Sequence, residues 1–187
     1  MTTATELLRH DHDAIVKMLD AAEAVAQRLD EGQPVRAEVL QNLLEFFRLF
    51  ADKCHHGKEE ELLFPLLEKK GVPVDGGPIG VMLNEHVQGR ALIKEMASAA
   101  DAYPSSPTEA GRRWASAARG YTELLRSHIF KENNILFVMA ERVLTPEEQG
   151  KLVADFETLE VEKMGAGTHE RLHAMMKDLL AEVMARP

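Results

Sequence analysis

The sequence predicts an all-α fold: an up-down antiparallel four-helix bundle with two additional C-terminal helices. Glycine and proline fall between long segments of helical periodicity, and no short segment alternates polar and apolar residues as a strand would. Short loops join the four long segments, which is typical of antiparallel neighbours in a bundle. We therefore expect one domain over 1–187, with the bundle over about 4–144 and a helical extension over about 146–185.

The first two predicted helices span about 4–30 and 35–70. Thr3 and Glu6 form a capping-box pattern at the start of the first helix, and glycine and proline follow its last residue. The second helix contains Pro65, which is expected to kink its last turn because proline cannot continue the intrahelical hydrogen bonds.

The later helices are marked by their starts. Pro78 opens the third, in the first helical position that proline favours. Two Ser/Thr-Pro-x-Glu signatures, beginning at Ser106 and Thr145, open the fourth and the fifth. The predicted helices after the first two are 78–102, 107–144, 146–163 and 168–185.

Composition limits the classes of function. The chain has 45% hydrophobic and 28% charged residues, enough for a core, and a net charge of −9 with its 22 Lys and Arg scattered. An acidic chain without a basic patch argues against nucleic acid or an anionic membrane as partner. No long apolar run predicts a signal peptide or a membrane span, so we expect a cytoplasmic protein. Cys54 is the only cysteine, so any metal must be held by nitrogen and oxygen.

An internal repeat is the most informative feature. The segment "HHGKEEELLFP" from His55 aligns with "HIFKENNILFV" from His128, which places Glu59 on Glu132. Each half also has an upstream histidine at almost the same separation, in "LLRHDHDAI" and "VMLNEHVQG". These two upstream residues are His12 and His86.

The spacing within the repeat predicts a metal site. A histidine and a glutamate four residues apart share one face of a helix and can bind a common ion. In an up-down bundle, four inward histidines and two inward glutamates would meet at one level of the core. Six such ligands suit a dinuclear centre in which the carboxylates bridge two cations and the histidines each bind one. The predicted ligands are His12, His55, Glu59, His86, His128 and Glu132.

Other polar residues near these motifs have plainer interpretations. On an α-helix His10 and His56 point away from the ligand face, so solvent or outer positions suit them, and Glu60 and Glu61 are expected on a solvated face. Cys54 is expected to pack, with redox sensitivity as the alternative. Tyr121 shares the face of His128 and is either a core residue or a hydrogen-bond donor towards an oxygen species.

The motifs "HDHDAI", "CHHGKEEELLFP", "GPIGVMLNEHVQGR" and "HIFKENNILF" together resemble the hemerythrin, or HHE cation-binding, domains over about residues 5–142. The resemblance implies a four-helix bundle that holds a non-haem di-iron centre, with the six predicted ligands binding two Fe ions under an oxo or hydroxo bridge. One position departs from the invertebrate oxygen carriers. They have a further histidine one turn after the third-helix ligand, where this chain has Arg90.

The C-terminal segment "GAGTHERLHAMM" offers a replacement for that histidine. His169 is the candidate fifth histidine ligand, and His173, four residues later, is the runner-up or an outer partner. The alternative is that the last helix only covers an apolar flank of the bundle.

Three functions follow from this reading. The first is a binding module for iron and a small ligand, O₂, NO or peroxide, that serves sensing, storage or detoxification. The second is an enzyme that consumes peroxide or NO at the same centre. The third is a structural bundle whose histidines bind adventitious zinc. A histidine-rich shell with two carboxylates tolerates ferrous iron, which favours the first two. We expect no nucleic acid or membrane as partner, and a chain that is a monomer or a weak homo-oligomer.

Overall fold

The computed structural model describes residues 2–184, and within that range it is helical without any strand. The α-helices are α1 (Ala4–Asp30), α2 (Ala37–Phe46), α3 (Phe64–Lys69), α4 (Pro78–Ala102), α5 (Pro107–Lys131), α6 (Phe137–Val143), α7 (Pro146–Met164) and α8 (Thr168–Met184). Three π-helical segments connect some of them: η1 (Phe47–His56), η2 (Glu59–Leu63) and η3 (Glu132–Leu136).

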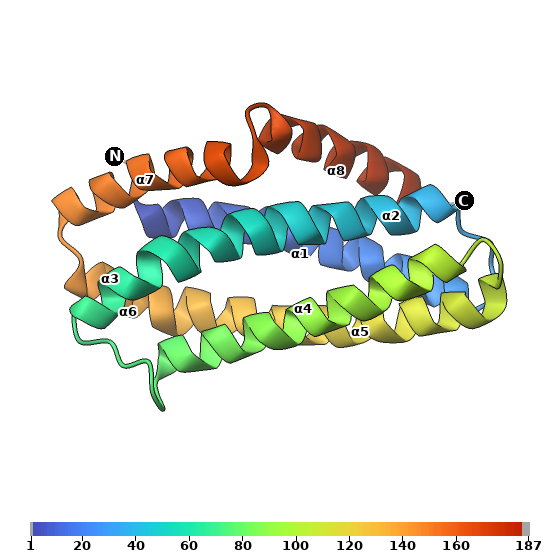
Figure 1. Cartoon of the computed structure of the whole chain (residues 1–187), viewed down its shortest axis with the longest axis horizontal. Coiled ribbons are helices and arrows are strands. Elements are labelled where there is room, and N and C mark those ends of the chain that lie inside the picture. Colours follow the sequence, from blue (N-terminus) through green and yellow to red (C-terminus); the bar gives the residue numbers. More distant parts are fainter. Residues whose placement is uncertain (1, 185–187) are drawn as a thin grey trace.

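The elements form four long rods that lie side by side (Figure 1). The first rod is α1 and the third is α4. The second runs from α2 through η1 and η2 to α3, and the fourth from α5 through η3 to α6. The chain reverses direction between successive rods, and α7 and α8 lie along one side of them. The all-helical prediction is confirmed, and the last predicted residue of the C-terminal helix, Ala185, lies outside the described residues.

The predicted helix starts differ in how their first N–H groups are capped. Capping boxes form at Thr3 with Glu6 and at Thr145 with Glu148. Ser106 makes no side-chain cap, so the capping box predicted there is wrong. Its backbone is not in the extended conformation that aims a cap hydroxyl at the helix, and α5 starts with Pro107 instead.

The predicted second helix is continuous in its winding but not uniform. It begins at Ala37, two residues later than predicted, and changes to π-helical hydrogen bonding over η1 and η2. Pro65 lies in the first turn of α3, directly after η2, where the hydrogen bonding changes from π-helical to α-helical. The i→i+5 bonds of a π-helix turn the side chains by less per residue than an α-helix does, which matters for the site below.

The core consists of two apolar clusters with a polar layer between them. Along α1, Leu8 belongs to the smaller cluster and Ile15 to the larger one, with Asp11 and His12 in between. The same order recurs on the other rods, where histidines and glutamates separate the clusters. The helix α8 packs Leu172 and two further apolar residues into the larger cluster, so the extension covers the rods as the alternative interpretation expects. No helix in residues 2–184 is long and apolar enough to span a membrane.

Candidate metal centre

The six ligands predicted from the repeat meet in the polar layer. They come from six elements in the four rods, and each side chain is almost wholly buried. Together with His56, they form two groups, and the ligating atoms within each group lie within 4.8 Å of one another. The α1 group is His12, His55, Glu59 and Glu132, and the α4 group is His56, Glu59, His86 and His128. Glu59 belongs to both groups.

The two glutamates lie between histidines of different groups. Glu59 has one oxygen 3.5 Å from Nε2 of His55 and the other 3.5 Å from Nε2 of His86. Glu132 Oε2 lies 3.1 Å from Nε2 of His12 and 3.3 Å from Nε2 of His128. Each carboxylate therefore lies within reach of histidines of both groups.

His56 is the residue that the sequence interpretation missed. Its side chain is buried, its ring stacks on that of His86 with centroids 3.8 Å apart, and it joins the α4 group. The expectation that it points away from the site is wrong because η1 is π-helical up to His56, so the α-helical rotation per residue does not apply. The buried run from Cys54 to Glu59 is a further sign, since a regular amphipathic helix buries one face.

In all five histidines, Nδ1 forms a hydrogen bond with a side-chain oxygen atom. A metal-ligating histidine donates its second ring N–H to such an acceptor, which sets the tautomer and the ring orientation. With Nδ1 donating, Nε2 of His12 and of His55 has no hydrogen-bond partner and can present its lone pair to the centre, whereas Nε2 of His86 and of His128 lie 3.1 Å from each other. The pairs are His12 with Asn133 at 2.9 Å, His55 with Asp11 at 3.3 Å, His56 with Asp52 at 3.3 Å, His86 with Glu60 at 2.6 Å and His128 with Glu85 at 2.9 Å. The expectation that Glu60 only faces solvent is therefore wrong.

Cationic side chains hold the acceptors in turn. Lys58 Nζ lies 3.2 Å from Asp11 Oδ2 and 3.1 Å from Glu160 Oε2, so α7 contributes to this network. Lys131 pairs with Glu85 in the same way. Despite burial, the hydrogen bond from His55 and the charge of Lys58 lower the pKa of Asp11 to about 2, which keeps it an acceptor.

The electrostatics of the bare residues are unfavourable. Burial, and then the charge of Glu132, raises the pKa of Glu59 well above its usual range. Burial acts the same way on Glu132, but His128 and His12 overcome it and hold its pKa well below the usual range. Two carboxylates at one level of a core therefore cannot both be charged without cationic neighbours.

Divalent cations fit this donor set. Both oxygens of Glu59 and of Glu132, and Nε2 of His12 and of His55, are buried without a hydrogen-bond partner. Buried polar atoms are otherwise paired in native proteins, so six unpaired donor atoms that converge on one layer fit the coordination of bound cations. Imidazole nitrogen and carboxylate oxygen suit iron, manganese or zinc.

A family model described as the hemerythrin HHE cation binding domain matches residues 3–140. The chain belongs to this family. The iron-sulfur cluster repair protein YtfE of Enterobacter sp. (strain 638) is 28% identical over 134 residues, covering 69% of this chain and 60% of YtfE. An uncharacterized protein of Mycobacterium bovis is 24% identical over 163 residues, covering 87% of this chain and 63% of that protein. The chain thus spans less than two thirds of these relatives, and no solved structure matches it significantly.

The C-terminal histidines lie outside both groups of the hemerythrin domain. His169 stacks on Phe50 with ring centroids 5.6 Å apart, and its Nδ1 is 3.8 Å from Glu160 Oε1. His173 contacts the edge of the same phenylalanine. The structure therefore does not bring His169 together with the six predicted ligands, and it supplies His56 instead.

Cys54 and Tyr121 are both buried. Cys54 Sγ donates to Glu160 Oε2 at 3.6 Å, and burial raises the pKa of its thiol to about 12, so it packs as a neutral thiol. Tyr121 packs on Phe47, and its hydroxyl has no hydrogen-bond partner. The core interpretation of both side chains agrees with this packing.

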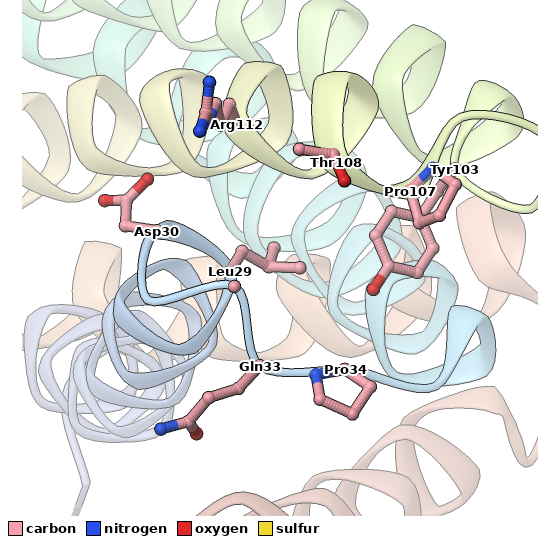
Figure 2. A pocket seen from close by; sticks show the side chains of 9 residues that line it. Leu29, Asp30, Gln33, Pro34, Tyr103, Pro107, Thr108 and Arg112 are labelled. Carbon is pink, nitrogen blue, oxygen red and sulfur yellow. The ribbon is translucent and has the colours of Figure 1, made fainter.

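A pocket of about 260 Å³ lies away from the metal groups, where α1 ends and α5 begins (Figure 2). Leu29 and Tyr103 line it together with Asp30 and Arg112, and it contains no residue of either group. The pocket is therefore separate from the hemerythrin site.

Proposed function

We propose that the four rods are an up-down antiparallel four-helix bundle that holds a non-haem di-iron centre, and that the protein uses it to bind a small ligand. The observation that carries the proposal is the set of six buried, unpaired ligand atoms that face one another. The proposed ligands are the six predicted from the repeat together with His56. Glu59, which belongs to both groups, would serve both cations, and Glu132, whose Oε2 lies near both His12 and His128, could do the same.

The protein residues have two tasks in this proposal. The buried layer excludes bulk water around the cations, since its side chains are almost wholly inaccessible. The outer acceptors keep each Nδ1 protonated, so that each Nε2 donates to a cation. When bound, iron supplies an electrophilic centre that can change valence and take up O₂, NO or peroxide. Seven ligands with only two carboxylates form a shell that tolerates ferrous iron, which favours sensing, storage or detoxification of these molecules.

Two alternatives use the same site. One is a di-iron enzyme that consumes peroxide or NO. The other is an iron donor, favoured by the likeness to YtfE, whose name describes repair of iron-sulfur clusters. With Cys54 as its single cysteine, buried, this chain lacks the set of thiolates that would hold such a cluster, so its part in repair would be to deliver iron.

The iron-loaded protein is reduced without air and then mixed with O₂, NO or peroxide in separate experiments, which separates these functions. A stable and reversible complex, followed by visible absorption, supports the binding function. Repeated turnover of peroxide or NO supports the enzyme, and transfer of iron to a chelator or an acceptor protein without either behaviour supports the donor. Elemental analysis should find two iron atoms per chain, and a protein that takes up zinc alone in iron-rich medium would contradict the di-iron proposal.

A further inference from the structure

Arg90 lies one helical turn after His86 on α4 and is 40% exposed. Its guanidinium reaches two carboxylates of the neighbouring rod. Nε donates to Asp52 Oδ1 at 2.7 Å, and Nη2 donates to Glu60 Oε1 at 2.8 Å. Arginine thus occupies the position where the oxygen carriers have a histidine, but it contacts acceptors and not the metal groups.

The same two oxygen atoms hold two histidines of the α4 group. Asp52 Oδ1 accepts from His56, and Glu60 Oε1 accepts from His86. The rings of these histidines are stacked with an angle of 16° between their planes. The guanidinium of Arg90 is therefore linked to both imidazole rings, in each case through one carboxylate oxygen.

We propose that Arg90 is a positioning residue for the α4 group, which fixes the ring orientation and the Nδ1 proton of His56 and His86 together. The inference rests on the proposed metal centre. Through Asp52 and Glu60, Arg90 aims both Nε2 atoms at the same cation. It also makes this cation, and not the one in the α1 group, depend on a residue that solvent can reach.

The chemistry of the guanidinium explains why arginine suits this position. Its N–H donors lie in one rigid plane and can engage two carboxylates with fixed geometry, whereas a lysine ammonium is a point charge on a flexible stem. Asp52 and Glu60 are only partly buried and carry like charges. Without the arginine they would repel each other and could turn to water, which would release both histidines.

The internal repeat supports the same conclusion. The residues equivalent to Asp52, His56 and Arg90 in the other half are Leu125, Ile129 and Val16, all apolar. All three polar residues are therefore found in one half of the repeat and replaced by apolar residues in the other, as expected if they act as one unit. Lys58 and Lys131, in contrast, are equivalent in the repeat and hold equivalent acceptors.

The test compares Arg90→Gln with Arg126→Gln in the full chain. Arg126 is a matched control because it is 38% exposed and pairs with two carboxylates, Asp20 and Glu23, that touch no histidine. Titration of the metal-free proteins with Co²⁺, followed by calorimetry and visible absorption, resolves the two sites. We expect one of the two affinities to fall about 10–100-fold in Arg90→Gln, the range for residues that orient metal ligands, and neither to change in Arg126→Gln.

A second measurement does not need a metal. Nitrogen-15 NMR of the histidine rings in the metal-free protein reports which ring nitrogen carries the proton. Arg90→Gln should change the signals of His56 and His86 and leave those of His12 and His55 unchanged. Arg90→Lys should not restore both signals, because an ammonium lacks the planar fork.

The outcomes separate the two proposals. Wild-type Co²⁺ binding and ring signals in Arg90→Gln would overturn the positioning role, and so would an equal loss at both sites, which indicates a general effect on the fold. A wild-type protein that does not bind two Co²⁺ ions overturns the proposed metal centre, and the NMR comparison then still decides whether Arg90 orients the two histidines.

Discussion

The α1 group and the α4 group are built alike up to a point and then differ. In each group, the residue before the upstream histidine accepts a hydrogen bond from the histidine of the repeated His-x-x-x-Glu motif. The same residue forms an ion pair with a lysine. Asp11 with Lys58 serves His55, and Glu85 with Lys131 serves His128. The residue after each glutamate holds the upstream histidine of the other half. These residues are Asn133 for His12 and Glu60 for His86.

The difference lies in what the α4 group adds. It has a third histidine, His56, and it has the carboxylate of Glu60 where the α1 group has the neutral amide of Asn133. The compensating cations also differ in exposure, because Lys58 is 7% exposed and Lys131 is 29% exposed. The comparison teaches that a repeated scaffold can give its two candidate cation groups unequal surroundings, one behind a buried ion pair and one behind a network that reaches the surface.

Glu59 belongs to both groups, so its removal should have the largest effect. Glu59→Ala should abolish binding of both cations, measured as iron per chain after reconstitution, because each site loses a carboxylate at once. Circular dichroism of the metal-free variant should remain helical, since an unpaired buried carboxylate costs stability rather than adding it. Glu61→Ala, at an exposed position two residues away, is the control and should bind metal normally. If Glu59→Ala retains one full equivalent of iron, the carboxylate is not shared.

Removal of His56 should leave the two groups with the same number of histidines. In His56→Gln each group keeps two histidines, so we expect the affinity of the α4 group alone to fall by at least about 10–100-fold, the loss typical of weaker, indirect changes to a site. Calorimetric titration with Co²⁺ should then show one wild-type site and one weak site. His10→Gln changes an exposed histidine and should leave both sites intact. Two wild-type sites in His56→Gln would return His56 to an outer role.

The two lysines should differ in their effect on stability. Lys58→Met leaves Asp11 charged and buried without its ammonium, which is expected to cost about 3–5 kcal/mol of the free energy of unfolding. Lys131→Met, at the equivalent position of the repeat, removes a partly exposed pair and should cost about 1 kcal/mol or less. Urea denaturation of both metal-free variants measures the difference. Equal losses would show that burial does not distinguish the two halves.

The smallest effect is expected at the C-terminal histidine. His169→Ala should leave iron content and the visible spectrum unchanged, because its ring packs on Phe50 outside both groups. The free energy of unfolding should fall by no more than about 1 kcal/mol, the range for an aromatic contact. Loss of iron or a changed spectrum would instead restore His169 as a ligand, as the sequence interpretation expected.

The repeat allowed the site to be located from the sequence alone, because equal spacing on two pairs of helices leaves few ways to place the side chains. His12, His55, His86 and His128 come together with both glutamates as predicted. His56 was missed because the sequence does not reveal where an α-helix changes to a π-helix.

The acceptors behind the histidines were also missed, although a signal existed. Asp11, Glu60, Glu85 and Asn133 are each the immediate sequence neighbour of a predicted ligand, and each accepts from a histidine on a different rod. Asp52 and Arg90 had no such signal, because their contacts depend on the winding of η1. The C-terminal helix could be predicted, but its histidines could not be placed without knowing how α7 and α8 return along the rods.

The polar layer that divides the core has a consequence for how the chain opens. Every rod crosses it, so the two apolar clusters are joined by backbone but share little apolar packing at that level. We therefore expect each cluster to unfold as its own cooperative unit, or foldon. Without cations, amide protons in the smaller cluster, which holds the rod ends around Leu63 and Leu136, should exchange independently of those around Trp114. Cations bound to the layer tie all four rods together and merge the two units into one.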